Sequence, residues 1–268
     1  MTSTPWYQVA PPPPALAHVL ACTWTAEPSG RHRLVPDACL DLLWLSNGQL
    51  WLCGPEVKAW TFQLPAGITA AGVRFRPGVV PAVFGISAHA LLDRRLPWGQ
   101  VVGSGVERQL AEQIAVAHDP LARVGVLEAH VAALTGAADG PDPFAEAVLF
   151  HVAEHPRVLA ARVASAVGLT TRQLHRRCLV SFGYGVATLA RIVRFHRFWS
   201  AAHLAPQGTP LTALAHAAGY ADHAHLVRDC RAITGSAPSR FLRESFATFP
   251  DMSDPYKTGP QFAATLGS

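Results

Sequence analysis

Two clusters of arginine, histidine and glutamine side chains stand out in this sequence, because such groups can form hydrogen bonds with the edges of DNA bases. Each cluster opens a stretch with helical apolar spacing, and the members are Arg172, Gln173, His175 and Arg176 in the first and His223, His225 and Arg228 in the second. Arginine can bond guanine at O6 and N7, and glutamine can bond adenine in the same two-point way. We therefore predict base contacts here. The alternative for Arg176 and Arg228 is an internal salt bridge, but arginine at the same place in both clusters favours contact with DNA.

Neighbouring side chains suit contacts with phosphates, which position a protein on DNA without reading its sequence. They are Thr171, Arg177, Arg231 and Arg240. Residues 151–245 hold twelve arginines, no lysine and four acidic residues, a net charge of +8 in a chain whose total is +4. A basic C-terminal part joined to an acidic N-terminal part is typical of a nucleic-acid-binding domain attached to another domain, although a solvated basic face would give the same count.

The stretch 211–243 must position the second cluster. Its apolar residues recur with a period of about 3.6 on either side of Gly219, which predicts two short helices joined by a tight turn. Asp222 stands where the second helix should begin and is a suitable N-cap. Leu226, Cys230 and Ile233 would form the buried side of that helix, and the histidines and arginines would face elsewhere. This is the arrangement of a helix-turn-helix that reads DNA with its second helix.

An internal repeat places the first cluster in the same setting. Ala164 and Gly168 correspond to Ala215 and Gly219 with an offset of 51, whereas beyond the turn the offset is 52. The later pairs are Leu174 with Leu226, Arg176 with Arg228, Cys178 with Cys230 and Gly183 with Gly235. The sequence thus predicts two helix-turn-helix units in tandem, and the second has one more residue in its turn. For the two recognition helices to enter successive major grooves they must lie roughly 34 Å apart.

Residues 145–245 resemble the tandem helix-turn-helix domain of the AraC/XylS family of transcription regulators. The family's pattern for the second unit is matched at Ala215, Gly219, Tyr220, Arg228, Arg231, Gly235, Pro238 and Phe241. Leu226 and Cys230 stand where the family usually has phenylalanine, which implies a differently packed core. The resemblance implies a regulator that binds double-stranded DNA and acts on RNA polymerase. The segments PDACLDLLW and GVRFRPG in the N-terminal half resemble an uncharacterised effector-type domain that precedes such DNA-binding domains, which implies no particular ligand.

Length and composition favour two domains of the α+β class. We expect a β-rich effector or dimerisation domain with C-terminal helices over 1–135, a linker over 136–143, the all-helical DNA-binding domain over 144–246 and a flexible tail over 247–268. Asn47-Gly48 between two apolar runs predicts a β-hairpin. Residues 1–35, rich in proline and glycine breakers, are expected to be irregular. The helical spacing over 104–133 predicts amphipathic helices that could join the domains or mediate a homodimer.

Four tryptophans in the N-terminal half could line an effector pocket or fill a core, and the core is favoured because tryptophan buries so much surface. They are Trp24, Trp44, Trp51 and Trp60. Arg74 and Arg76, two apart in an extended segment, should point the same way and could hold a carboxylate or phosphate. The alternative, slightly favoured, is a salt bridge to Asp37 or Asp41. The candidate effector pocket is thus Trp44, Trp60, Arg74 and Arg76.

Catalysis and metal binding have little support. Nucleophile motifs, phosphate loops and zinc-protease signatures are missing from the sequence, so we expect no enzyme activity and no cofactor. The histidines around Cys230 have no metal-ligand spacing, and no metal site is expected. Asp37, Cys39 and Asp41 would share one face of a strand, where a ligand pocket or plain packing is favoured over a catalytic site. The five scattered cysteines indicate buried thiols.

The chain shows no signal peptide and no apolar run that could span a membrane, so a soluble, cytoplasmic protein is expected. Together these features predict a sequence-specific DNA-binding transcription regulator, controlled by a small molecule bound to the N-terminal domain. Two alternatives remain: an N-terminal domain that is catalytic, and one that only dimerises.

Overall fold

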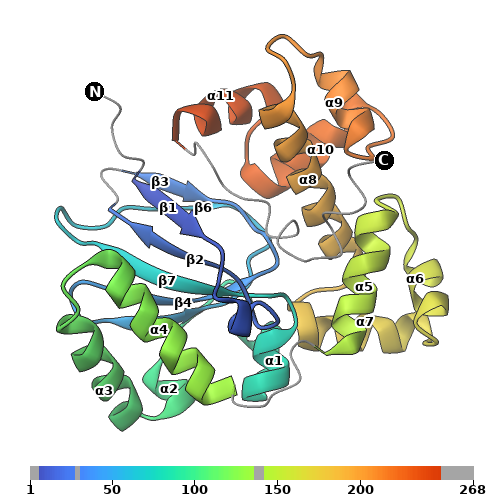
Figure 1. Ribbon diagram of the computed structural model, residues 1–268. Helices are drawn as coiled ribbons and strands as arrows, with labels where there is room; N and C mark the ends of the chain where they lie inside the picture. Colours follow the sequence, from blue (N-terminus) through green and yellow to red (C-terminus); the bar gives the residue numbers. More distant parts are fainter. Residues whose placement is uncertain (1–5, 28–30, 136–141, 249–268) are drawn as a thin grey trace.

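The computed structural model describes residues 6–27, 31–135 and 142–248, with side chains up to residue 244. The N-terminal part is built on a six-stranded antiparallel sheet in the order β1-β2-β7-β4-β5-β8, beside a two-stranded sheet of β3 and β6 (Figure 1). The strands are β1 (Tyr7–Ala10), β2 (Leu20–Ala26), β3 (His32–Leu34), β4 (Leu40–Leu45), β5 (Leu50–Cys53), β6 (Trp60–Phe62), β7 (Ala70–Phe75) and β8 (Arg95–Pro97).

The expectation that residues 1–35 are irregular is wrong, because β1, β2 and β3 all lie there. The proline run 11–14 falls between β1 and β2. The run Leu20–Ala26, LACTWTA, carries the threonine and tryptophan that strands favour. The hairpin predicted at Asn47-Gly48 is confirmed, since it joins β4 to β5 and Gly48 has φ +88°.

Strand alternation divides the large sheet into two faces with different cover. Leu42, Trp44 and Val73 face a buried core closed by the helices that follow the sheet, and α4 packs directly on β2 and β7 (Figure 1). These elements are α1 (Val79–Phe84), the 3-10 helix η2 (Ala88–Leu91), α2 (Gly99–Val102), α3 (Ser104–Ala115) and α4 (Pro120–Thr135), with the shorter 3-10 helix η1 (Pro14–Leu16) before β2. Asp41 and Arg74, on the same two strands, face the opposite side, where β3 and β6 lie.

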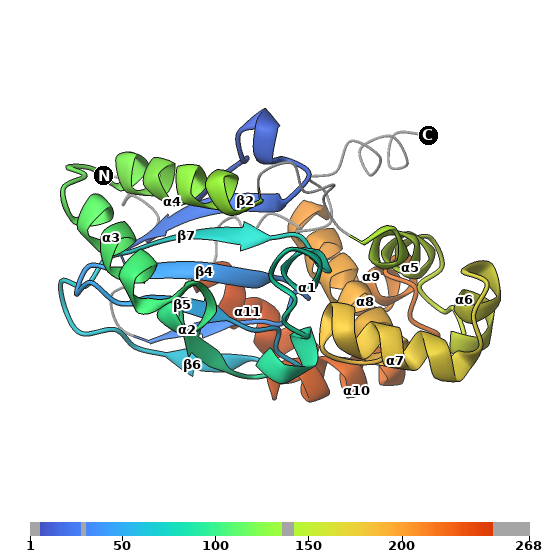
Figure 2. The same cartoon turned by 90° about the horizontal axis from the view of Figure 1, so that it is seen from below.

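The C-terminal part is helical. Its elements are α5 (Pro143–Glu154), α6 (Ala160–Ala166), α7 (Thr171–Phe182), α8 (Val186–Leu204), α9 (Leu211–Ala217), α10 (His223–Thr234) and α11 (Pro238–Thr248). Helix α8 packs against α5, α7, α9 and α10 and so joins the two halves of this part (Figure 2). The α+β class is confirmed. The predicted linker falls almost wholly on residues 136–141, outside the described residues, as does nearly all of the predicted tail.

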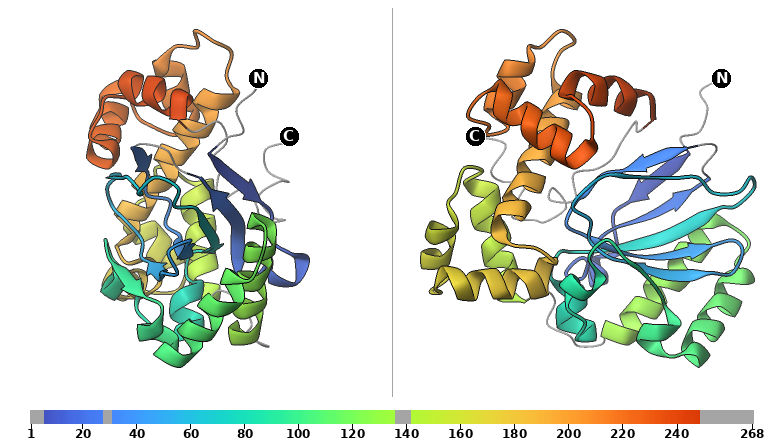
Figure 3. Two further views of the ribbon diagram at one scale, coloured as in Figure 1. Left: turned by 90° about the vertical axis from the view of Figure 1, so that its left-hand side faces the viewer. Right: turned by 180° about the vertical axis from the view of Figure 1, so that it is seen from behind.

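The two parts of the chain are in extensive contact. Val35, which follows β3, is packed into the core around Phe195 and Tyr220, and Ala38 is packed into the core around Leu174. Between them, the ring of His196 bonds the carbonyl of Pro36 through Nε2 at 2.6 Å. The two-stranded sheet lies beside α10 and α11 (Figure 3). The segment 35–38 therefore belongs to the cores of the helical part.

Within the described ranges, no single helix is both long and apolar enough to cross a membrane. Helices α7 and α8 reach that length and apolarity only as a pair, across a bend of 55°.

Candidate DNA-binding surface and ligand cavity

The two predicted helix-turn-helix units are present and have the same turn. In the first, α6 leads through Gly168 into α7, and Leu169 donates its N–H to the carbonyl of Ala164 at 2.8 Å. In the second, α9 leads through Gly219 into α10, and Tyr220 donates to Ala215 at 2.9 Å. This bond five residues back ends a helix in the Schellman manner and needs a left-handed residue, here glycine in both units.

The two units differ in how the second helix begins. Helix α7 starts from Thr170, whose side chain accepts from the N–H of Gln173, while Gln173 Oε1 accepts from the N–H of Thr170 at 2.9 Å. Helix α10 starts one residue later relative to its turn, from Asp222, which accepts from the N–H of His225 at 2.6 Å. The offset of 51 before the turn and 52 after it is therefore a difference in cap position.

Four of the predicted base-contacting side chains are exposed, and in the described part of the chain none of the four has an ion pair. They are Arg172 and Arg176 on α7 and His223 and Arg228 on α10. His175 is also exposed, and its ring lies so close to Gly185 that a Cβ there would come within 2.7 Å of Nδ1. Among the described residues, neither Arg176 nor Arg228 forms the internal salt bridge considered as the alternative.

Two other predicted base contacts have internal partners. Gln173 serves in the cap of α7, as described above. His225 is half-buried, lies edge-on to the ring of Tyr220 at 5.1 Å, and places Nε2 3.5 Å from Asp229 Oδ2. Asp229 also binds Arg194 of α8 at 2.9 Å. The bonds of Gln173 stabilise the first turn of α7, and the contacts of Asp229 join α10 to α8.

The predicted phosphate contacts are likewise of two kinds. Thr171 and Arg231 are exposed without a salt bridge among the described residues. Arg177 binds Asp142 at 3.1 Å and stacks on Phe144, and Arg240 binds Glu244 at 2.6 Å. Several other arginines of the basic region bond backbone carbonyls inside the domain: Arg157 to Gly219 and Tyr220, Arg194 to Pro156 and Arg197 to Ala153. The charge of +8 is thus only partly available to DNA.

The N-terminal part holds the C-terminal end of each recognition helix. Gly183, which caps α7, has its carbonyl oxygen 2.9 Å from Nδ1 of His89 in η2. At the end of α10, Ile233 accepts from the N–H of Ala59 at 2.6 Å, and Arg33 of β3 donates to the carbonyl of Thr234. The first turns of both helices stay exposed.

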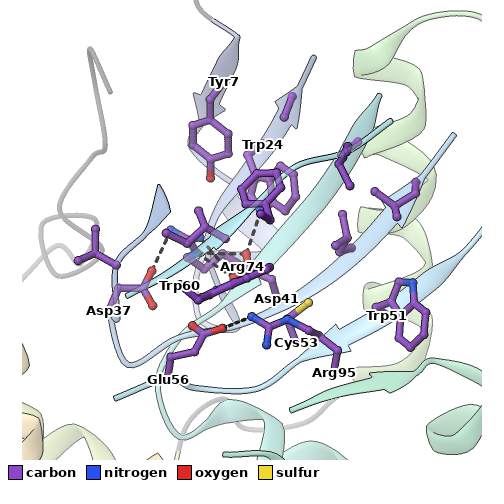
Figure 4. A pocket seen from close by; sticks show the side chains of 18 of the residues that line it. Tyr7, Trp24, Asp37, Asp41, Trp51, Cys53, Glu56, Trp60, Arg74 and Arg95 are labelled. Carbon is purple, nitrogen blue, oxygen red and sulfur yellow. Dashed lines mark hydrogen bonds and ion pairs between the residues drawn. The ribbon is translucent and has the colours of Figure 1, made fainter. Parts of the chain in front are cut away.

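A cavity of about 340 Å³ lies between the free face of the large sheet and the small sheet β3–β6 (Figure 4). Its aromatic lining is Trp6, Tyr7, Trp24, Trp51, Trp60 and Phe62. Its charged lining is Asp37, Asp41, Glu56, Arg74 and Arg95. Trp24 lies flat over Gly72 of β7, where a Cβ would come within 2.4 Å of its ring.

Ion pairs organise one end of this cavity. Arg74 binds Asp37 at 3.0 Å and Asp41 at 3.1 Å, and Arg95 binds Glu56 at 2.5 Å while stacking on Trp60. Burial raises the pKa of Glu56 to about 7, against the attraction of Arg95. Burial also raises the pKa of Asp41, although Arg74 opposes the shift. Despite its own burial, Arg74 has a pKa well above the ordinary value because Asp37 and Asp41 stabilise its charge.

The sequence located this cavity only in part. Trp60 and Arg74 do line it, and the alternative of a salt bridge from Arg74 to Asp37 and Asp41 is also realised. Trp44 was placed wrongly: it lies three residues after Asp41 in β4, so it faces the helical core.

Arg76 is also misplaced. Strand β7 ends at Phe75, and Arg76 turns its Nε to the carbonyl of Ala17 at 2.7 Å. Cys39 is buried outside the cavity lining, because β4 begins only at Leu40. The core prediction holds only in part for the other tryptophans: Trp24, Trp51 and Trp60 are half-buried and line the cavity, although Trp24 and Trp51 also pack against the small apolar cluster around Leu45. Among the described residues, no three His, Cys, Asp or Glu side chains are grouped as metal ligands would be.

A tandem pair of helix-turn-helix units with exposed arginines on both second helices defines a DNA-binding protein. The profile of a helix-turn-helix domain family matches residues 163–244, and that of a domain of unknown function, DUF6597, matches residues 8–97. The match confirms the resemblance to an AraC-type helix-turn-helix domain for the C-terminal part of the chain, and it supports DNA-binding transcription regulation through this part.

Crystal structures of ToxT from Vibrio cholerae are similar to this chain over most of its length. An apo variant from strain SCE256 is 12% identical, with 90% of this chain and 98% of that chain covered and a TM-score of 0.46. ToxT from strain O395 is 10% identical, with 92% and 99% covered and a TM-score of 0.47. At this distance the likeness says nothing about ligands. No curated protein gave a significant sequence match.

Proposed function

We propose that α7 and α10 read a specific DNA sequence, and that a small molecule in the cavity controls how the two helices are presented. Arg172, Arg176, His223 and Arg228 would contact base edges, with His175 beside them. Their exposure at the start of each recognition helix supports these roles. Thr171, Arg177, Arg231 and Arg240 would contact phosphates, the two ion-paired arginines after exchanging their carboxylate partners for DNA. Gln173 and His225 would reach bases only by giving up the internal contacts described above.

The observation that carries ligand control is the short connector between β5 and β6, residues 54–59. On one side, its residues Gly54 and Glu56, followed by Trp60, line the cavity. On the other, Pro55 lies against Gly183 at the end of α7, and Ala59 donates to Ile233 at the end of α10. A molecule that moves this connector would alter the contacts at the ends of both recognition helices. A ligand that binds one arrangement of the connector more tightly than another would therefore change the affinity for DNA, as allosteric control requires.

The cavity supports this proposal over an N-terminal domain that only dimerises, because an aromatic-lined pocket with a few convergent charged groups is typical of a small-molecule site. The regulator would act on RNA polymerase and work in the cytoplasm. A homodimer would use the surface where α3 leads into α4, because Val116, the C-cap of α3, and Leu121 of α4 are 72% and 73% exposed.

Selection of bound sequences from a random DNA pool tests the reading of DNA. We expect Arg172→Ala and His223→Ala each to relax base preference at a few positions. The effect should be larger for Arg172, because a bidentate arginine contact contributes about 1–3 kcal/mol of discrimination, whereas a histidine donates a single hydrogen bond. We expect Arg231→Ala to weaken binding to all sequences alike and to lower the slope of log affinity against log salt by about one. Unchanged preferences in the first two variants would refute the assignment.

A further inference from the structure

The charged end of the cavity holds more negative than positive groups. Three carboxylates (Asp37, Asp41 and Glu56) and two guanidinium groups (Arg74 and Arg95) line it. The side chains of Arg74, Asp37 and Asp41 are only 9%, 10% and 17% exposed. When all of these groups are ionised, the described residues of the cluster carry one surplus negative charge. Burial opposes this state and raises the pKa of Glu56 to about 7, so either a proton or a bound cation can offset the charge, and above pH 7 a cation is favoured.

Both arginines are already committed to these carboxylates. Arg74 uses Nη1 for Asp37 and Nε for Asp41, and Arg95 uses Nη2 for Glu56. An anionic ligand would have to displace a buried carboxylate and would meet three of them. The lining therefore disfavours an anion.

The walls of the cavity suit a positive charge. Aromatic faces attract cations, and Trp24 lies flat on the sheet with Tyr7 5.5 Å away between ring centroids. Trp24 donates its Nε1–H to Asp41 at 2.8 Å, so the edge of the indole ring lies beside the carboxylate. The hydroxyl of Tyr7 is buried without a hydrogen-bond partner among the described residues and points toward Arg74 and Asp41 (Figure 4).

The volume limits the size of the ligand. A cavity of about 150 Å³ takes up benzene. The 340 Å³ present here is therefore room for two fused rings with a short substituent.

We propose that the cavity binds an organic cation, a protonated amine on an apolar body of two aromatic rings, with its ammonium group beside Asp41 and its rings against Trp24 and Trp60. The inference rests on the proposed ligand control and adds the chemical class of the ligand.

Three probes with one ring system and three charges test it: 2-naphthylmethylamine, 2-naphthylmethanol and 2-naphthoate. Each is titrated calorimetrically into the full chain at about pH 7.5, where a primary amine is protonated. We expect the amine to bind at least about tenfold more tightly than the alcohol, since a charge-assisted hydrogen bond to a buried carboxylate adds to the attraction of the aromatic faces, which alone accounts for only about threefold. We expect the carboxylate to bind more weakly than the alcohol.

Two variants assign the preference to the surplus charge. Asp41→Asn and Asp37→Asn each remove one negative charge from the cluster and keep a side chain of the same shape. If one variant does not fold, the other still provides the test. In either, the advantage of the amine over the alcohol should fall to about threefold or less, with the affinity for the alcohol unchanged. Asp119→Asn removes the same charge at the exposed cap of α4 and should leave the advantage intact.

DNA affinity, measured with and without each probe, separates this inference from the proposed function. If the alcohol or the carboxylate binds as tightly as the amine, or if the asparagine variants keep the amine's advantage, the cation inference is refuted. Should such a probe still shift DNA affinity, ligand control stands. If the amine binds best and DNA affinity does not move, the ligand class is supported and the control is refuted. If none of the three binds, the inference fails.

Discussion

At the scale of single residues, Gly219 is the most constrained point of the second helix-turn-helix unit. It has φ +89°, and a Cβ there would come within 2.6 Å of Pro156. Gly208 has nearly the same φ, +87°, but a Cβ there would meet nothing within 4 Å. It is a matched control that isolates backbone strain from the clash.

We expect Gly208→Ala to lower the free energy of unfolding by about 1–2 kcal/mol, the cost of a left-handed alanine. Gly219→Ala should cost about 1–3 kcal/mol more, because the loop at Pro156 must also move. Thermal unfolding of both variants followed by circular dichroism measures the difference. Equal losses would mean that Pro156 yields freely.

Glu56 should make the stability of the protein depend on pH. Its folded-state pKa of about 7 lies above the ordinary value of 4.5, so the folded protein binds more protons than the unfolded chain between these two values. Stability contributed by Glu56 is therefore complete below about pH 4.5, is lost as the pH rises toward 7, and totals up to roughly 3 kcal/mol. Urea unfolding from about pH 5 to 8 should show a fall in the wild type that Glu56→Gln reduces. A parallel fall in both proteins would place the titration elsewhere.

Residue roles could be predicted where a local rule decides them. The exposure of Arg176 and Arg228 follows from helical spacing, and the cap at Asp222 follows from its position before an apolar run. Alternation alone would have put Trp44 on the face opposite Asp41. The role of Gln173 in a capping box was also readable, as Thr170 stands three residues before it. The partners of Arg74 and His225 depend on residues far along the chain or across a helix interface, and spacing cannot rank them.

At the scale of elements, the helices of the two helix-turn-helix units and the hairpin of β4 and β5 were predictable, because apolar spacing, glycine turns and Asn47-Gly48 mark them. Strand β8 and the short helix α2 have no such signal and were missed. Strands β1, β2 and β3 were missed since prolines between them suggested an irregular segment. The cavity could not be predicted at all, because it is made by β3 and β6 folding over a sheet face formed by strands distant in sequence.

The same two-sheet layout predicts separable effects on the two DNA-reading units. Arg33→Ala removes the contacts of β3 with Thr234 and Ser236, so it should loosen α10. His89→Ala removes the contact with Gly183 and should loosen α7. With a selected operator, we expect each variant to bind roughly five- to tenfold more weakly, about 1–1.4 kcal/mol for a lost polar contact. Footprinting should show the protection lost over a different half-site in each.

Arg31→Ala, which changes an exposed arginine two residues before Arg33, provides the control for charge and should leave both half-sites protected. If Arg33→Ala and His89→Ala weaken the same half-site, then the N-terminal part supports the two units as one body and the separate clamps are not independent.

At the scale of the whole molecule, the boundary between the two parts in sequence is not the boundary between their cores. Val35 is 5% exposed in the core formed around Phe195 and Tyr220, and Ala38 is 1% exposed in the core of the first unit. A segment of the N-terminal part thus completes both helical cores, which sequence periodicity cannot show because four residues carry no period.

Because segment 35–38 completes the helical cores, a packing defect in this segment should raise amide hydrogen exchange in the helical part of the chain. Val35→Ala should cost about 2 kcal/mol of packing and raise hydrogen exchange mainly in α10 and α11, although the mutated residue lies in the N-terminal part. Val73→Ala, a matched change at a fully buried site in the sheet core, should raise exchange mainly in β4 and β7. Exchange measured by mass spectrometry on the full chain compares the two. If Val35→Ala raises exchange in the sheet and spares α10, then segment 35–38 stabilises only its own part, and a ligand in the cavity would have to reach the recognition helices through the connector at 54–59 alone.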